Sequence, residues 1–414
     1  MYFYDKIAYN TLEREVNNMQ LNTNLYYVGI QDFDLRVFDI IMETKFGTSY
    51  NSYLLKTEAG DVLFETAKAK FFDEYLENIK AYTTLDQIKY VVCSHTEPDH
   101  VGSLERLLEL CPEITVISSP VAANYLKEIV NHPFQSKTVK DNEIMEIGQY
   151  HFQFLSVPNL HWPDTMYTYI QELKTLVTCD SFGAHYATHH LLLSKVENQD
   201  DYQEAFLYYT KMILSPFKPF LLKAMHKLDG MEIEMILPGH GPVIDTNIQG
   251  MIEAYKKYCE PVGNETKSVV IPYVSCYGYT ETMAKVLKEV MEANQLQCEM
   301  YDLVSADMNQ VITACQSADG ILYGCPTLLN DALPPIYHVM NEILMPYYGA
   351  KIVSAFGSYG WTGEAVGNML VRLKQMKHKV VDEGYRCKFK PSDTQLAELR
   401  AYGENFAKHV IEGK

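Results

Sequence analysis

The sequence lacks several features that would assign the protein to familiar classes. Its 9 cysteines form no C-x-x-C pair and are odd in number, which argues against a disulfide framework, a zinc ribbon or an iron–sulfur cluster. No apolar run approaches the length of a membrane span. The first residues, MYFYDKIAYNTLEREV, lack the apolar core and cleavage site of a signal peptide. We therefore expect a reducing, cytoplasmic location.

Basic residues are also scarce. The chain has 35 Lys and Arg against 53 Asp and Glu, a net charge of −18. This balance repels phosphate backbones and anionic lipid surfaces, so we expect neither nucleic acid nor a membrane as a partner. An apolar fraction of 47% and a charged fraction of 21% are typical of soluble globular proteins, and 414 residues suffice for two domains.

The first part of the chain alternates apolar strands with occasional helices. A polar stretch at 255–268 is typical of a linker, and we predict domains at 1–262 and 263–414. In the first domain, strands covered by helices favour an α/β/β/α sandwich. Its strands are predicted at 24–30, 49–57, 61–66, 88–95, 114–119, 151–158 and 174–180, with helices at 122–130 and 205–216.

The second part has a regular alternation of strands and helices, which predicts a doubly wound parallel sheet. The fold class is therefore α/β in both domains. Strands are predicted at 268–274, 298–303, 320–325 and 351–358. Helices are predicted at 282–294, 309–318, after Pro334, and at 364–377 and 395–410.

The segment SHTEPDHVGS (94–103) carries four potential metal ligands directly after an apolar strand: His95, Glu97, Asp99 and His100. Four such residues at this spacing seldom arise from solvation alone, so the segment strongly indicates a metal site. Mixed imidazole and carboxylate ligands suit non-haem iron, whereas hydrolytic zinc sites favour imidazole and thiolate. Glu97 therefore favours a redox-active pair of irons.

Further candidates lie at similar places in the sequence: His161 follows SVPNL, Asp180 ends KTLVTCD and His240 follows EMILPG. Together the set has four histidines and three carboxylates, enough for two metal ions with Asp180 as a bridge. His185, His189 and His190 follow Asp180 closely and are more consistent with supporting or surface roles than with ligation. Surface or capping roles are expected for His132, His151, His378 and His409.

Three loops of the second domain indicate a flavin site. The loop SCYGYT (275–280) precedes a helix N-terminus, where backbone N–H groups and the helix dipole favour a phosphate. No basic residue occurs from 275 to 284, which suits the monophosphate of FMN better than a triphosphate. Two later loops follow strand ends, where open α/β sheets bind ligands. The candidates are Ser275, Cys276, Tyr277, Gly278, Tyr279, Thr280, Pro326, Thr327, Leu328, Leu329, Asn330, Gly357, Ser358, Tyr359, Gly360, Trp361 and Gly363.

Over nearly its whole length the chain resembles the flavodiiron proteins, which join a metallo-β-lactamase-like domain to a flavodoxin-like domain. The resemblance rests on FGTSYNSYLLK (46–56), SHTEPDHVGS, NLHWPDTM (159–166), TCDSFG (178–183), LPGHGP (237–242) and the three flavin loops. It implies one iron on His95, Glu97 and His161, a second on Asp99, His100 and His240, and Asp180 as the bridge. His100 is the least secure ligand, because its equivalent stands off the metal in some members.

The resemblance implies an oxidoreductase that reduces dioxygen to water, nitric oxide to nitrous oxide, or both. Electrons would pass from rubredoxin or another small donor through FMN to the irons, and the chain would form a head-to-tail homodimer or a dimer of dimers. Since no C-x-x-C pair lies in the chain, we expect a separate donor. Many members have a histidine in the stretch that here reads RVFDII (36–41), where this chain has Asp39. The alternatives are a zinc-dependent hydrolase with a flavodoxin-like passenger domain and a non-catalytic FMN electron carrier.

Overall fold

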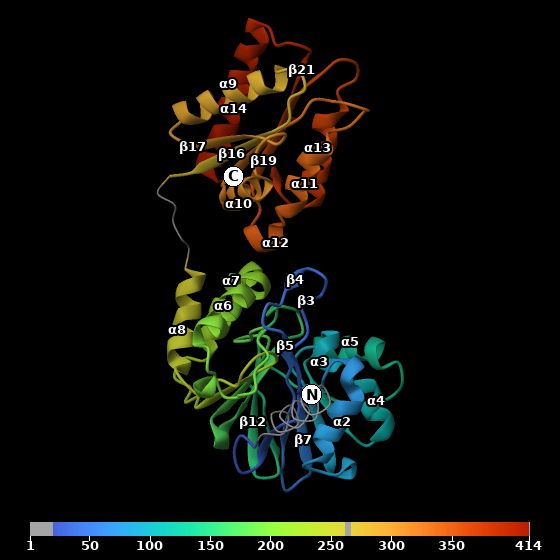
Figure 1. The fold of residues 1–414 in the computed structure, drawn as a ribbon. Coiled ribbons are helices and arrows are strands. Elements are labelled where there is room, and N and C mark those ends of the chain that lie inside the picture. The colour runs from blue at the N-terminus through green and yellow to red at the C-terminus, as the bar shows by residue number, and fades with distance from the viewer. Residues whose placement is uncertain (1–19, 261–265, 414) are drawn as a thin grey trace, which may run out of the picture. The chain divides into compact units, whose positions relative to one another are not determined.

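The computed structural model describes residues 20–260 and 266–413, which form two units that divide between Glu260 and Pro261 (Figure 1). The predicted boundary at 262/263 lies among residues outside this description and stays a prediction. Residues 255–259, which we assigned to the linker, are instead the last turn of α8 (Ile248–Cys259). The reason is packing: Tyr255 is buried and stacks on Phe206, with ring centroids 5.5 Å apart.

The first unit contains two large sheets with helices on their outer faces, and two additional two-stranded sheets (Figure 1). One sheet has the order β1-β6-β7-β8-β9-β10 and the other β11-β12-β13-β14-β15. Its strands are β1 (Leu25–Tyr27), β2 (Ile30–Asp32), β3 (Val37–Phe38), β4 (Met42–Glu43), β5 (Thr48–Tyr50), β6 (Tyr53–Leu55), β7 (Asp61–Phe64), β8 (Ile88–Cys93), β9 (Thr115–Ser118), β10 (Gln135–Thr138), β11 (Ile144–Ile147), β12 (Tyr150–Ser156), β13 (Met166–Ile170), β14 (Thr175–Cys179) and β15 (Met235–Pro238). Its helices are α2 (Phe72–Lys80), α3 (Pro98–Val101), α4 (Leu104–Leu110), α5 (Pro120–Val130), α6 (Gln199–Tyr209), α7 (Lys218–Lys227) and α8.

Alternating side chains divide this unit into layers, because successive residues of a strand point to opposite faces. Val62 and Val92 belong to the cluster between the two sheets, whereas Leu63 and Val91 pack in the cluster that includes the outer helices. The predicted sandwich is confirmed. The predicted strand 49–57 is two strands, because Asn51 turns inward and donates to the carbonyls of Pro238 and Gly241. The predicted helix 205–216 begins earlier, at Gln199, and continues beyond α6 as a π-helical turn, Thr210–Leu214.

The second unit is a parallel sheet of order β17-β16-β18-β19-β20, with β21 also paired to β19, so the predicted doubly wound sheet is confirmed. Helices α9 and α14 pack on one face, and α10, α11 and α13 on the other (Figure 1). The strands are β16 (Ser268–Tyr273), β17 (Gln297–Asp302), β18 (Gly320–Gly324), β19 (Ile352–Tyr359), β20 (Lys379–Val380) and β21 (Tyr385–Lys388). The helices are α9 (Tyr279–Ala293), α10 (Met308–Ser317), α11 (Pro334–Glu342), α12 (Met345–Tyr348), α13 (Glu364–Gln375) and α14 (Asp393–Glu412). None of the helices in the described ranges combines the length and apolar character needed to cross a bilayer.

Candidate metal centre and flavin cavity

The seven predicted metal ligands come from both sheets of the first unit. The segment after β8 supplies four of them, and α3, begun by Pro98 at its first position, carries Asp99 and His100. The other three lie beyond the ends of β12, β14 and β15. Because these strand ends meet at one edge of the sandwich, residues far apart in sequence converge there.

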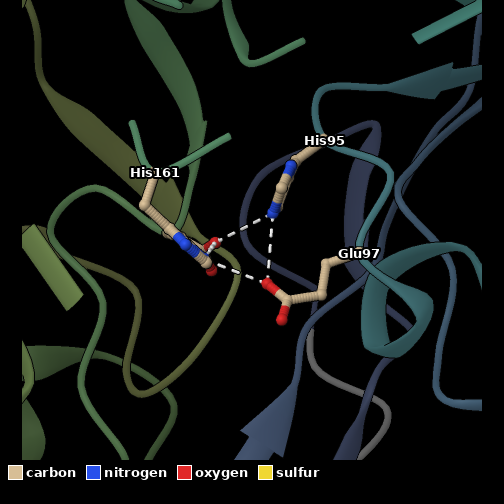
Figure 2. Close-up of side chains that lie close together, drawn as sticks. His95, Glu97 and His161 are labelled. Carbon is tan, nitrogen blue, oxygen red and sulfur yellow. Dashed lines mark hydrogen bonds and ion pairs between the residues drawn. The ribbon is translucent and has the colours of Figure 1, made fainter. Parts of the chain in front are cut away.

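The first group joins His95, Glu97 and His161 (Figure 2). Glu97 Oε2 lies 3.2 Å from His95 Nε2 and 3.0 Å from His161 Nε2. Asp180 Oδ2 lies 3.5 Å and 3.2 Å from the same two nitrogens. Two imidazoles and two carboxylates thus present unshared electron pairs to one small volume.

The second group joins Asp99, His100 and His240. Asp99 Oδ2 lies 3.5 Å from His100 Nε2 and 3.2 Å from His240 Nε2. Asp180 again completes the set, but with its other oxygen: Oδ1 lies 3.0 Å from His100 Nε2 and 3.5 Å from His240 Nε2. The two oxygens of one buried carboxylate therefore face two different ligand groups.

The electrostatics of these groups fit two bound cations. Burial opposes protonation of His161, yet hydrogen bonds to Asp180 and Glu97 raise its pKa to about 10. Burial likewise opposes protonation of His100, but the charge of Asp99 leads the influences that raise its pKa well above the usual value. Both Asp99 oxygens and Asp180 Oδ2 are buried, so their negative charge needs nearby positive charge to balance it. Protons on the histidines here balance buried carboxylates, and metal ions would replace those protons.

Several neighbours of the centre orient the ligands. Asp164 contacts His95 Nδ1 at 3.3 Å, and the Ser49 carbonyl lies 2.5 Å from His240 Nδ1. The Tyr209 hydroxyl donates to Asp180 Oδ1 at 3.0 Å. None of the three was predicted from the sequence, and only Asp164, in NLHWPDTM beside His161, carried a local signal. Tyr209 lies in a run of apolar and aromatic residues and gave none.

The three histidines that follow Asp180 in sequence have different surroundings. His185 is buried beside the centre, with its Nδ1 2.9 Å from Thr48 Oγ1 and its ring 5.2 Å from that of His240. Burial lowers the pKa of His185 well below the usual value, so this ring is neutral. His189 stacks on Phe33, and His190 lies 3.5 Å from Glu197 at the surface.

Outside the centre, the four histidines that we expected to have surface or capping roles differ in burial. His151 contacts Glu172 at the surface at 2.6 Å. His378, in contrast, is buried: its Nε2 donates to the Ile343 carbonyl, and its Nδ1 accepts from the Lys351 N–H.

In the second unit, a cavity of about 530 Å³ lies at the carboxyl ends of the strands. Aromatic and apolar side chains line it and remain open to solvent: Trp361 is 91% exposed and Leu329 98%. The volume, the aromatic walls and the N-terminus of α9 fit a flavin with a phosphate. The predicted residues that line the cavity are Cys276, Tyr277, Tyr279, Pro326, Thr327, Leu328, Leu329, Asn330, Ser358, Tyr359, Gly360 and Trp361.

Five predicted residues do not line this cavity: Ser275, Gly278, Thr280, Gly357 and Gly363. They shape it instead. Gly278 and Gly363 have φ values of +77° and +79° where α9 and α13 begin, and a Cβ at Gly357 would lie 1.9 Å from the Cys325 carbonyl oxygen. The Thr280 hydroxyl lies 3.1 Å from that of Ser358.

Two residues of the cavity wall, Thr362 and Phe389, were not predicted from the sequence. Thr362 lies inside a loop that was predicted. Phe389 follows β21, a strand that was not predicted, although its apolar ring at a strand end is a usable signal.

The fold and the two sites define a two-domain α/β protein with a binuclear metal centre and a flavin cavity. Residues 48–241 match the ODP family beta lactamase, and residues 271–403 match flavodoxin. A flavo-diiron protein of Clostridium acetobutylicum is 38% identical over 95% of this chain and 99% of its own. A nitric oxide reductase of Moorella thermoacetica is 30% identical over 95% and 98%. The rubredoxin oxygen:oxidoreductase structure from Desulfovibrio gigas superposes with a TM-score of 0.69 at 26% identity, covering 96% of this chain and 99% of that one.

The chain belongs to the flavodiiron proteins. It is therefore an oxidoreductase, and its family implies FMN in the flavodoxin domain and a di-iron site in the β-lactamase-like domain. The predicted family, fold class and cofactors are confirmed.

Proposed function

We propose that this protein is a terminal reductase that passes electrons from a small donor protein through FMN to two irons, where dioxygen becomes water or nitric oxide becomes nitrous oxide. The observation that carries the proposal is the position of Asp180, whose two oxygens face two separate groups of ligands at 3.0 to 3.5 Å. One carboxylate so placed can hold two metal ions close enough to act on one small molecule.

In this proposal His95, Glu97 and His161 hold one iron, and Asp99, His100 and His240 hold the other. When bound, the iron pair supplies the electrons that a small oxidant accepts. The chain's own residues provide the surroundings. Asp180 spans both positions, Tyr209 fixes the Asp180 carboxylate, and the neutral His185 helps to close the pocket with Phe38, whose ring lies 4.4 Å from it. Buried aromatic walls exclude bulk water and keep the charges of the ligands effective.

The chain's flavin cavity would hold FMN with neutral donors around the phosphate and with Tyr359 and Trp361 beside the ring. Support comes from the lining of the cavity and from the glycines that permit close backbone approach. A flavin accepts electrons in pairs or singly, so it suits transfer from a one-electron donor to a two-metal site.

The experiment that tests the activity is single-turnover oxidation of the reduced protein under anaerobic conditions, mixed separately with dioxygen and with nitric oxide. Faster oxidation by dioxygen identifies an oxygen reductase. Faster oxidation by nitric oxide, with nitrous oxide formed, identifies a nitric oxide reductase. Oxidation by neither, or a metal content of zinc with little iron, contradicts the proposal and returns the zinc hydrolase to consideration.

Asp39 is the residue that we propose adjusts the choice between these substrates. It lies in the turn between β3 and β4, where its own φ is +47° and that of Ile40 is +70°. Burial, followed by the charges of Glu97 and Asp99, raises the pKa of Asp39 to about 6, and a hydrogen bond with Glu97 contributes to the rise and places the carboxyl beside that ligand. We expect Asp39→His to change the ratio of the two single-turnover rates. An unchanged ratio would exclude Asp39 as a determinant.

We further propose that two chains pair head to tail, so that the FMN of one serves the irons of the other, with rubredoxin or a similar protein as donor. This follows the family resemblance. A mixture of Asp180→Ala, which lacks the metal bridge, with a variant emptied of FMN tests it directly. Turnover that appears only after the two variants are allowed to exchange subunits supports transfer between chains. A monomeric solution mass with full activity contradicts it.

A further inference from the structure

One side of the flavin cavity carries a concentration of positive charge. β21 and the two residues after it read YRCKFK, and Arg386, Lys388 and Lys390 are all exposed. No Lys or Arg occurs in the loops that form the rest of the cavity, which are 275–280, 325–331 and 357–363. In a chain with a net charge of −18, the end of β21 is therefore the basic side of the flavin site.

Backbone pairing places these cations directly beside residues that line the cavity. In the parallel pairing of β19 with β21, Lys388 is the partner of Tyr359 and Arg386 is the partner of Gly357. Adjacent strands lie about 4.8 Å apart, and Tyr359 lines the cavity. The Phe389 N–H donates to the Tyr359 carbonyl at 2.9 Å, and the Phe389 side chain forms part of the cavity wall. The basic segment thus continues the wall of the cavity.

The charges of this segment are not neutralised within the described part of the chain. The side chains of Arg386, Lys388 and Lys390 form no ion pair and no hydrogen bond there. By contrast, Arg400 of α14 pairs with Glu289 at 2.7 Å. An unpaired cation at the surface keeps its charge available to an approaching partner.

Two exposed aromatic side chains accompany the cations. Trp361 and Phe389 both line the cavity and are both open to solvent. Transient electron-transfer contacts are small, and they combine an apolar centre with charges around it that orient the partner. The surface that matches this arrangement is that of a small protein with carboxylates around its redox centre.

The charge of the whole chain makes the orientation of such a partner more specific. An acidic protein is repelled by most of a surface that has 53 Asp and Glu against 35 Lys and Arg, and it is attracted at the end of β21. An encounter that begins there brings the partner to the wall of the flavin cavity. Charge complementarity therefore selects the docking position as well as the partner.

We propose that the end of β21 is the docking surface for a small acidic electron-donor protein, with Arg386, Lys388 and Lys390 as its cations and Trp361 and Phe389 as its apolar centre. The inference rests on the electron route under "Proposed function" and adds the place where the donor binds. Each of two reduced donor molecules would lose one electron here, and both electrons, with protons from solvent, would go to the flavin. The cations hold the donor and exchange no proton.

The test neutralises the three cations together in the FMN-loaded full chain, as Arg386→Gln, Lys388→Gln and Lys390→Gln. Reduced acidic rubredoxin is mixed anaerobically with the oxidised protein, and flavin reduction is followed at increasing donor concentrations. At an ionic strength of about 0.1 M the Debye length is about 10 Å, so distant charges are screened while this surface still acts. The second-order rate constant should fall about ten-fold, the lower end of the range for electrostatic steering. At about 1 M salt the substituted and unsubstituted proteins should react equally fast.

The matched control combines Arg372→Gln, Lys374→Gln and Lys377→Gln. It removes the same charge from the same unit, but at the C-terminal end of α13, just before β20. β20 pairs with the first residues of β19, whereas Tyr359, beside the cavity, is the last. The control should keep the rate constant of the unsubstituted protein. No fall in the β21 variant, or an equal fall in both variants, overturns the proposal.

Two measurements on the same variants identify other uses of the cations. Loss of FMN from the β21 variant alone would assign them to the flavin phosphate. NADH and NADPH are also tested as reductants. Faster flavin reduction by either one than by rubredoxin, lost in the β21 variant, would assign the cations to a dinucleotide. Each of these results overturns the proposal.

The unsubstituted protein covers the case in which the β21 variant does not fold. Its rate constant with rubredoxin should fall as the ionic strength rises from about 0.1 M to about 1 M, and a flat or rising dependence overturns the proposal. Reduction by dithionite, which needs no docking surface, separates this inference from the proposed function. Dithionite-reduced protein that reacts with neither dioxygen nor nitric oxide would refute the proposed function itself. Protein that reacts with either gas but is not reduced by rubredoxin would refute only the docking surface.

Discussion

Asp180→Asn should remove one metal ion selectively. The substitution keeps the shape of the side chain but replaces one oxygen by an NH₂ group, which cannot bind a metal. Tyr209 donates to Oδ1 at 3.0 Å, so the amide oxygen is held at that position. A hydrogen bond of roughly 1 kcal/mol gives this orientation about a five-fold preference. The NH₂ group then takes the place of Oδ2, which faces His95 and His161 at 3.5 and 3.2 Å.

The metal position of His95, Glu97 and His161 should therefore weaken more than the position of Asp99, His100 and His240. Loss of a partner to a ligand costs about 10–100-fold, and loss of an anionic ligand should exceed the upper value, at least about 2.7 kcal/mol. The assay is competitive titration with Co²⁺, with FMN occupancy read in parallel and expected to stay unchanged. Tyr209→Phe combined with Asp180→Asn is the control, because it frees the amide to rotate and should reduce the selectivity. Equal weakening of both positions in Asp180→Asn alone would refute the argument.

Three further outcomes are expected. Tyr277→Ala and Thr280→Val should each lower FMN affinity about ten-fold by flavin-fluorescence titration and leave iron content unchanged, because they alter only the flavin loop; a loss of iron would contradict this. Gly357→Ala should lower the melting temperature of the flavodoxin unit, because its Cβ would lie 1.9 Å from the Cys325 oxygen, and overpacking costs about 1–3 kcal/mol or more; an unchanged melt by calorimetry would refute it. Chelation of both metals should lower the melting temperature of the first unit by roughly 15–30 °C, if each ion is present at about 1,000 times its dissociation constant; equal melting of loaded and metal-free protein would contradict a structural role for the metals.

The sequence predicted the parts of the site that local patterns encode. Four ligands lie within six residues after one strand, and the flavin loops follow strand ends, so spacing and strand position sufficed to find them. Tyr209 gave no such signal. It contacts Asp180 from α6 through side-chain geometry that depends on packing between distant elements. Patterns of residue type cannot report such contacts.

The layers of the fold were predicted more completely than the ends of its individual helices and strands. Apolar alternation found the two-layer sandwich, because burial on two faces leaves a periodic signature. It missed β21 and Phe389, since a short strand with Arg386 and Lys388 reads as a polar loop. The end of α8 was assigned to a linker, because Lys256 and Lys257 make that turn polar in the sequence although Tyr255 is buried.

The position of the Asp180 carboxylate between the two ligand groups depends on a local irregularity in β14 that the pattern of residue types does not predict. Between Val177 and Cys179 the pairing of β14 with β15 shifts, so that one residue of β14 has no counterpart. Cys179 then adopts a φ of +50°, which is rare for a residue with a side chain. A bulge of this kind turns the chain and redirects the next side chain. Asp180 is that next residue, and the turn lets both of its oxygens face ligand groups supplied by different strands. A regular strand would carry Asp180 along the sheet and offer at most one oxygen to the centre. The backbone strain at Cys179 is therefore tied directly to the feature that makes the site binuclear.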